Sequence, residues 1–358
     1  MCCMSVLYRV WHACWNSSSN LKPSVMNKLL SLFLVVFAGC SQSESSVSDS
    51  QLAYLGQSPP GNTPELFAPG VVSTGANEMS ICFSEKGDEV FLLVARPTLI
   101  ITSKIKNGEW TSFEEPAFID SARSNYYMFL SPNGKKMFFT STRPDGDSKD
   151  SVAPNPGPAI WVTERSEGMW DTPQKVDFGD EFKGTGSFPS VADNGNLYFS
   201  SFDNKTISVY CSKYVNGKYT TPIRLSDSIN QGTFNSHVYI APDESYLLFD
   251  SRGRDDVIGG VDIYISFRDE NGNWTKAQNI GDKINSESSD MRSYVSTDGQ
   301  YFFFCSSRQT KNRNLPAHPM KGDQIRSILN APGNGQQDIY WVSASFIDDL
   351  KKLKFNLK

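Results

Sequence analysis

The feature that most constrains the fold is a repeated pair of apolar segments separated by a short polar turn. The pattern occurs five times, in ICFSEKGDEVFLL, MFLSPNGKKMFFTS, PSVADNGNLYFSS, YIAPDESYLLFDS and YVSTDGQYFFFCSS. The turn residues are Gly87, Gly134, Gly195, Glu244 and Gly299, with spacings of 47, 61, 49 and 55 residues. Pro, Asp or Asn followed by Gly is typical of hairpin turns that need a positive φ. Each repeat therefore predicts a β-hairpin. Glu244 breaks the glycine rule, and we expect its turn to be strained or of another type.

A second hairpin follows the first in most repeats. Aromatic strands such as AIWVTE, SVYCSKY and DIYISF lead into the turns NGEW (107–110), EGMW (167–170), NGKY (216–219) and NGNW (271–274). Two hairpins make a four-stranded meander of roughly 45 residues, and such meanders repeated radially are the blades of a β-propeller. We expect Trp110, Trp170, Tyr219 and Trp274 to pack within and between blades, and sugar binding is the alternative role.

The fifth repeat lacks an outer strand, and the segment PELFAPGVVST (64–74) supplies a spare one. Pairing of this N-terminal strand with the last blade would remove two exposed edges. The sequence therefore predicts an all-β fold: a single closed propeller, five-bladed, or six-bladed if a degenerate repeat lies within 306–337. The amphipathic segment ASFIDDLKKLKF (344–355) predicts a short C-terminal helix.

Two segments carry a resemblance to a known family. SPNGKKMFFTSTR (131–143) and DSRGRDDVIGGVDIYISFRDENGNWTKAQNIGDKINSE (250–287) resemble the TolB-type, WD-like propeller repeats of bacterial envelope proteins. The resemblance extends over roughly residues 64–345. It implies a propeller located in the cell envelope, and it implies no particular ligand, because propellers host many functions.

The N-terminal segment predicts an export signal. LLSLFLVVFAG (29–39) follows Lys28 and is too short for a comfortable membrane span. A short basic lead, an apolar core and a small-residue end make a secretory signal, here residues 26–40. We expect translation to start at Met26 and residues 1–25 to be an upstream extension. Phe37-Ala38-Gly39-Cys40 resembles a bacterial lipobox, which implies a lipid on Cys40; an ordinary signal peptide with an incidental Cys is the alternative.

The predicted signal is followed by a tether, a domain and a tail. SQSESSVSDSQ begins a polar, Ser-rich stretch that predicts a flexible tether over 41–60. The propeller is expected over 61–350 and a C-terminal tail over 351–358. By resemblance, Ser41 lacks the Asp that retains some lipoproteins at the inner membrane. We therefore expect a lipid-anchored protein of the outer membrane that faces the periplasm or the cell surface.

The charge balance argues against nucleic acid as a partner. The chain has a formal net charge of −5, and its first forty residues contain three basic residues and no acid. The remainder is more acidic still, whereas nucleic-acid binding needs a basic face. We expect an envelope protein or glycan as partner, with membrane contact through the lipid alone.

Two sets of polar residues are candidates for a binding site. Arg143, Arg252 and Arg308 each end a second strand in the frame S-x-R or S-R, before the longest loops (141–159, 250–261 and 306–337). Their guanidinium groups suit carboxylate or phosphate, and pairing with a nearby acid, Asp145, Asp255 or Asp256, is the alternative. The second set lies nine residues before each turn marker and is expected at the mouth of the channel: Glu78, Asn125, Gly186, Asn235 and Asp290. Such a ring suits a ligand or Ca²⁺, and solvated strand ends are the alternative.

Signals for catalysis and for metals are weak. DGDSKD (145–150) resembles a calcium loop but lacks the EF-hand spacing. Two His residues beyond the leader, His237 and His318, cannot form a three-His zinc site. His237 is a candidate general base or a structural His. We expect no resident cofactor or metal, with Ca²⁺ as a weak alternative.

Three Cys residues beyond the leader, Cys82, Cys211 and Cys305, are too few and too widely spaced for a disulfide framework. Since Cys82 and Cys305 fall in expected strands, we expect buried thiols there.

The leading functional hypothesis is a membrane-tethered, non-enzymatic module that binds protein or glycan. One alternative is a carbohydrate-active hydrolase or lyase that uses acids in the channel, such as Glu78 with Asp290. Another is a structural envelope protein. The sequence does not choose an oligomeric state.

Overall fold

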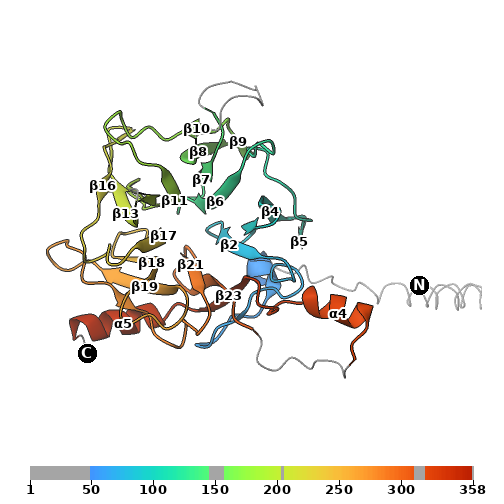
Figure 1. Cartoon of the computed structure of the whole chain (residues 1–358). Coiled ribbons are helices and arrows are strands. Elements are labelled where there is room, and N and C mark those ends of the chain that lie inside the picture. The colour runs from blue at the N-terminus through green and yellow to red at the C-terminus, as the bar shows by residue number, and fades with distance from the viewer. Residues whose placement is uncertain (1–48, 145–156, 203–204, 310–318, 357–358) are drawn as a thin grey trace, which may run out of the picture. The chain divides into compact units, whose positions relative to one another are not determined.

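The computed structural model describes residues 49–144, 157–202, 205–309 and 319–356. Strands and short turns make up most of these residues (Figure 1). Within a blade, most strands pair antiparallel with the next one along the chain, because the connecting turns are short enough for hairpins.

Within these ranges the strands form five four-stranded meanders, named here blades 1 to 5. Blade 1 consists of β2 (Glu78–Phe83), β3 (Glu89–Val94), β4 (Leu99–Lys106) and β5 (Glu109–Trp110). Blade 2 consists of β6 (Asn125–Leu130), β7 (Lys136–Ser141), β8 (Ala159–Ser166) and β10 (Gln174–Lys175), with β9 (Met169–Trp170) also paired to β8. Blade 3 consists of β11 (Gly186–Val191), β12 (Leu197–Phe202), β13 (Ile207–Ser212) and β16 (Ile223–Arg224), with β14 (Tyr214–Val215) and β15 (Lys218–Tyr219) as a separate hairpin. Blade 4 consists of β17 (Phe234–Ile240), β18 (Tyr246–Arg252), β19 (Asp262–Phe267) and β20 (Gln278–Asn279). Blade 5 consists of β21 (Asp290–Val295), β22 (Tyr301–Ser306), β23 (Asp338–Ser343) and β1 (Glu65–Leu66).

The innermost strands of the blades form a closed circle. In contact order they are β2, β6, β11, β17 and β21, and β21 contacts β2 again. Figure 1 shows these strands facing a common centre, with the later strands of each blade further out. Apolar side chains fill the space between blades, and the middle strands contribute fully buried aromatics such as Phe91, Phe139 and Phe199. The predicted β-propeller is confirmed.

The N-terminal strand closes the circle. Glu65 and Leu66 of β1 pair with Trp341 and Tyr340 of β23, so blade 5 takes its outer strand from the opposite end of the described chain. Phe67 follows directly, is fully buried, and has its ring within 5.0–5.7 Å of the rings of Phe83, Phe303 and Trp341. The predicted closing strand is confirmed, although only two residues of 64–74 form the strand.

Part of the predicted flexible tether packs on the propeller instead. Residues 49–56 form the short helices α3 (Asp49–Leu52) and η2 (Ala53–Gly56). The Tyr54 ring lies 5.0 Å from that of Phe83 and 5.1 Å from that of Tyr301. Its backbone N–H donates to the carbonyl of Gly87. The Ser-rich composition predicted a flexible tether over 41–60. Around Tyr54 this prediction fails, because the aromatic side chain packs against the propeller.

Two longer helices complete the described fold. Helix α4 (Gly322–Leu329) lies within 306–337, and the described residues of that segment after β22 form no strand. They therefore supply no sixth blade. Helix α5 (Phe346–Phe355) follows β23 and confirms the predicted C-terminal helix. Figure 1 shows it near β19, and the Phe355 ring lies 6.2 Å from that of Phe267.

The exceptional turn residue Glu244 has a structural role. Its φ is +58°, the left-handed region that the glycines occupy in the other four turns. The carboxylate accepts hydrogen bonds from Asn194 (2.8 Å), Asn196 (3.1 Å) and the Tyr198 hydroxyl (2.5 Å), all in blade 3. The backbone strain that the sequence predicted is thus accompanied by three bonds that join blade 4 to blade 3, which no glycine could make.

The closure makes a prediction about stability. Replacing Phe67 with Ala should lower the free energy of unfolding by about 3–5 kcal/mol, because removal of this fully buried ring leaves a cavity where the two ends of the propeller meet. Phe202→Ala is the matched control, since that side chain is 55% exposed. Denaturant unfolding measures both, and equal stability of the two variants would contradict the closure model.

Candidate functional site

The innermost strands share a local irregularity. The pairing of each with its neighbour shifts register near its start, at Glu78/Ser80, Tyr126/Phe129, Ser187/Ser190, Ser236/Tyr239 and Met291/Tyr294. Such a shift is a β-bulge, which redirects a side chain and is common beside active sites.

In four blades the bulge places a non-glycine residue at positive φ. These residues are Tyr127 (+57°), Phe188 (+59°), His237 (+47°) and Arg292 (+59°). In blade 1 the register skips Met79 instead, and Ser80, which stands at the same distance before the turn, pairs with Leu93. A left-handed conformation of this kind costs of order 1–3 kcal/mol per residue. Strained residues cluster at functional sites, so backbone strain repeated at one position of four blades makes this position a candidate functional site.

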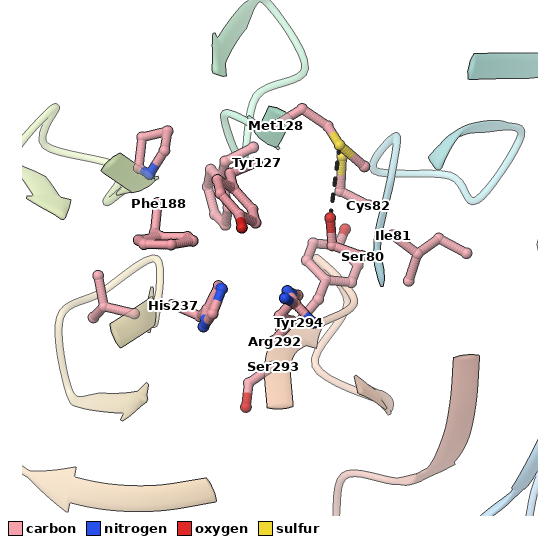
Figure 2. Close-up of a pocket in the computed structure, with 13 residues that line it drawn as sticks. Ser80, Ile81, Cys82, Tyr127, Met128, Phe188, His237, Arg292, Ser293 and Tyr294 are labelled. Carbon is pink, nitrogen blue, oxygen red and sulfur yellow. Dashed lines mark hydrogen bonds between the residues drawn. The ribbon is translucent and has the colours of Figure 1, made fainter. Parts of the chain in front are cut away.

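The four bulge residues and Ser80 meet in one pocket. Ser80, Tyr127, Phe188, His237 and Arg292 line a cavity of about 50 Å³, and Figure 2 shows them around a common space. The neighbouring lining residues are Ile81, Cys82, Met128, Phe129, Pro189, Val238, Ser293 and Tyr294. The pocket thus takes residues from all five blades and lies where their innermost strands converge. Its volume suffices for a few water molecules or a small chemical group. We call it the channel pocket.

Aromatic rings form one side of the channel pocket. The Phe188 ring centre lies 4.0 Å from that of Tyr127 and 3.9 Å from that of His237. The Arg292 guanidinium lies 5.8 Å from the centre of the Tyr127 ring. The wall therefore offers apolar surface to the body of a ligand and a single permanent cation to its polar group.

His237 lies against a buried acid. Its Nδ1 is 2.6 Å from Oδ2 of Asp250, which is fully buried in β18. Burial, with a smaller contribution from the Arg292 charge, lowers the pKa of His237 well below its usual value. Burial likewise raises the pKa of Asp250 well above its usual value, against the opposing effect of Arg292. Burial therefore disfavours a charge on either residue.

Arg292 is held firmly at one end. Its Nη1 donates to Oε1 of Gln337 at 2.7 Å and contacts the Cys305 sulfur at 3.2 Å, and its backbone N–H donates to both Asp250 oxygens. In contrast, neither Nε nor Nη2 makes a hydrogen bond to any described residue, and Nε is buried. The pocket thus contains a fixed guanidinium with an unused hydrogen-bonding edge.

The predicted ring of polar residues starts the innermost strands, as expected, but its side chains are buried. Glu78, Asn125, Asn235 and Asp290 are at most 5% exposed. Glu78 accepts from the Thr74 hydroxyl at 2.5 Å, and burial raises its pKa. None of the four, nor Gly186, lines the channel pocket. A binding role for them stays a prediction, and their geometry is that of structural groups.

The predicted arginines meet this ring. Arg143 donates to Oδ1 of Asn125 at 3.3 Å and to the carbonyl of Phe118 at 3.1 Å. Arg308 donates to Oδ1 of Asp290 at 2.6 Å and to the carbonyl of Ile284 at 2.5 Å. Each guanidinium also lies near two aromatic rings of its own blade. In blades 2 and 5 the two predicted sets therefore join into one bracing unit.

In blade 4 this position belongs to Arg254, two residues beyond the predicted Arg252. Arg254 donates to Asn235, Ser251 and the carbonyl of Ile229, the bonds that Arg143 and Arg308 make in their blades. Arg252 is exposed, lies 4.9 Å above the Phe234 ring, and forms no ion pair with the described Asp255 or Asp256. The equivalence of the three predicted arginines is thus corrected: the extra residues of this loop move the bracing guanidinium along the chain.

Sequence reasoning missed most of the channel pocket. It named His237 but not Ser80, Tyr127, Phe188, Arg292 or Asp250. A sequence signal did exist: Ser80, Tyr127, Phe188 and Arg292 each stand two residues after a predicted ring position. Examples are Glu78-x-Ser80 and Asp290-x-Arg292. Strand alternation places both positions on one face, so only the bulge separates them.

The remaining candidates are the thiols and the predicted metal-binding residues. Cys82 and Cys305 are buried and unpaired, as predicted, and burial raises their thiol pKa values to about 12 and about 11. DGDSKD (145–150) and His318 lie outside the described residues. Across the ranges that the structure describes, no group of three or more His, Cys, Asp or Glu side chains is arranged to hold a metal ion.

Comparison with known proteins gives distant structural matches. No family model and no curated protein matches the chain. A putative TolB from Agrobacterium tumefaciens aligns with a TM-score of 0.45 and 14% identity, over 75% of this chain and 90% of that one. TolB from Acinetobacter baumannii gives 0.41 and 14%, over 75% and 57%. The arabinanase Arb43A of Bacillus subtilis gives 0.44 and 10%, over 77% and 95%.

The chain is a β-propeller similar to TolB proteins. In the described part of this propeller, no helix is long and apolar enough to span a membrane. The predicted signal and Cys40 lie outside the described residues.

The bracing role of Arg308 is testable. Arg308→Gln should lower the free energy of unfolding by about 3 kcal/mol, because it leaves the fully buried carboxylate of Asp290 without its cation. Arg252→Gln, the exposed arginine of blade 4, should change it by less than about 0.5 kcal/mol. Urea unfolding measures the stability of both variants. An Arg308 variant with unchanged free energy of unfolding would refute the bracing role.

Proposed function

We propose that this protein is an envelope lipoprotein, anchored through Cys40, whose propeller is a non-enzymatic binding module for an envelope protein or glycan. The ligand enters the channel pocket with one of its groups. One observation carries the proposal: in four of the five blades a bulge places a residue of the innermost strand at positive φ, and these four residues, with Ser80 of blade 1, line the same small cavity. Purely structural packing does not require four strained residues at this position.

The chemistry of the channel pocket favours binding over hydrolysis. A glycosidase needs two carboxyl groups that flank the scissile bond. Glu78 is bonded to Thr74, and Asp290 is paired with Arg308. Asp250 lies beneath His237 and accepts two bonds from the backbone of Arg292. Each of these acids is thus engaged in holding the fold, while aromatic surface and a cation face the cavity.

A channel-filling variant tests the binding function. Ser80→Trp should abolish capture of an envelope component by the domain 41–358, because an indole in place of this small lining residue occupies the channel pocket. The assay compares pull-downs from envelope extract, followed by analysis of the captured protein and glycan.

Arg326→Ala is the control, since it changes a 70% exposed side chain of α4 and leaves the channel pocket intact. Variants of Arg143 or Arg308 are unsuitable here because they disturb the blades themselves. Equal melting temperatures establish that Ser80→Trp is folded. Undiminished capture by a folded Ser80→Trp protein would refute binding in the channel pocket.

The anchor is tested separately. Cys40→Ser should move the full chain from the membrane fraction to the soluble fraction, because the thiol that would carry the lipid is lost. Fractionation of cells that express each form measures the distribution. Retention of the variant in the membrane fraction would rule out lipid anchoring at Cys40.

A further inference from the structure

The channel pocket contains an arginine whose hydrogen-bonding capacity is half used. A guanidinium presents five N–H donors in a rigid fork. In Arg292, Nη1 is occupied by Gln337 and Cys305. Nε and Nη2, which together form the side-on edge of the group, make no hydrogen bond to any described residue. Nε is buried, and a buried donor without a partner is costly, so this end of the group calls for an acceptor.

The position of this edge is set by the fold. Arg292 stands at the bulge of β21 with φ +59°, and its backbone N–H is held by both oxygens of Asp250. With Nη1 also fixed, little freedom remains in the side chain. Figure 2 shows its nitrogen atoms near the middle of the group of residues that line the cavity. The guanidinium is therefore held ready before any ligand arrives, which lowers the entropic cost of binding.

We propose that the channel pocket is a receptor for a carboxylate group, which binds side-on to Nε and Nη2 of Arg292 while the body of the ligand contacts Tyr127 and Phe188. Two parallel N–H···O bonds match the planar fork to the two oxygens of a carboxylate. This inference rests on the proposed binding function and adds its ligand chemistry.

Charge and size favour a carboxylate over phosphate. Arg292 is the single Arg or Lys among the residues that line the channel pocket, and a buried acid, Asp250, lies next to it. One positive charge balances a monoanion, whereas a phosphate dianion would leave excess negative charge in a buried site. The cavity of about 50 Å³ admits a carboxylate and keeps the rest of the ligand at its mouth. A chain end or a sugar acid supplies the same group.

The test is a titration of the domain 41–358 with matched pairs of small probes. The carboxylates are N-acetylglycine and galacturonate, and their neutral counterparts are N-acetylglycinamide and galactose; inorganic phosphate is a further probe. Ligand-observed NMR suits the weak affinity of such small groups, for which we expect a dissociation constant on the order of 1 mM. At least one carboxylate should bind tenfold or more tightly than its counterpart and than phosphate.

Three variants assign the effect to the Arg292 fork. Arg292→Gln should weaken carboxylate binding at least tenfold, and Arg292→Lys should restore only part of it, since a point charge replaces the bidentate edge. Arg326→Gln, an exposed arginine of α4 that does not line the channel pocket, should leave binding unchanged. Melting temperatures identify any variant that fails to fold. Ser80→Trp obstructs the cavity without removing the Arg292 charge. It should also abolish carboxylate binding, which tests independently that the probe binds inside the channel pocket.

The outcomes separate this inference from the binding function itself. Binding of N-acetylglycine alone identifies a chain end as the source, and binding of galacturonate alone identifies a sugar acid. No carboxylate binding, equal binding of the neutral counterparts or of phosphate, or full binding by a folded Arg292→Gln variant overturns the carboxylate site. If Ser80→Trp abolishes envelope capture while Arg292→Gln preserves it, the binding module stands and the carboxylate inference fails.

Discussion

The structure depends on the pairing of β1 with β23. A ring of blades has two free edges until the ends of the chain meet, and free edges expose unpaired backbone groups. Here Glu65 and Leu66 complete blade 5, and Phe67 packs among the rings of Phe83, Phe303 and Trp341. This closure holds β21 against β2. Without that contact the innermost strands would not converge, and the channel pocket would lack its complete wall.

Two sets of residues on the innermost strands have different roles. Residues at the start of the innermost strands are buried and, in blades 2, 4 and 5, are bonded to Arg143, Arg254 and Arg308. Two positions further along, the bulge turns Tyr127, Phe188, His237 and Arg292 into the cavity. The first class stabilises the blades, and the second leaves hydrogen-bonding capacity unused. Unsatisfied donors and strained backbone are common at binding sites because a ligand completes what the fold leaves open.

The turns show how far local sequence rules extend. Four of the five marker residues are glycines at positive φ, and three of these four follow Asn or Asp, the pairs typical of hairpin turns. Glu244 adopts the same conformation, and its departure from the pattern has a long-range cause in its bonds to Asn194, Asn196 and Tyr198. A local rule identified the turn as unusual. Only the neighbouring blade explains why a strained residue is present.

The sequence by itself determined the repeated hairpins, the meander of four strands, the closing strand and the C-terminal helix, because hydrophobic alternation and turn chemistry are local properties. It also drew attention to Arg143, Arg308 and Asp290 as special residues. Tertiary structure decided what they do. An alternating strand would place Asp290 and Arg292 on the same face, and the bulge between β21 and β22 sends one into the blade and the other into the channel. Loop length likewise gave the bracing position of blade 4 to Arg254 instead of Arg252. A bulge adds one residue to a register that the partner strand defines, so its effect is visible only once the strands are paired.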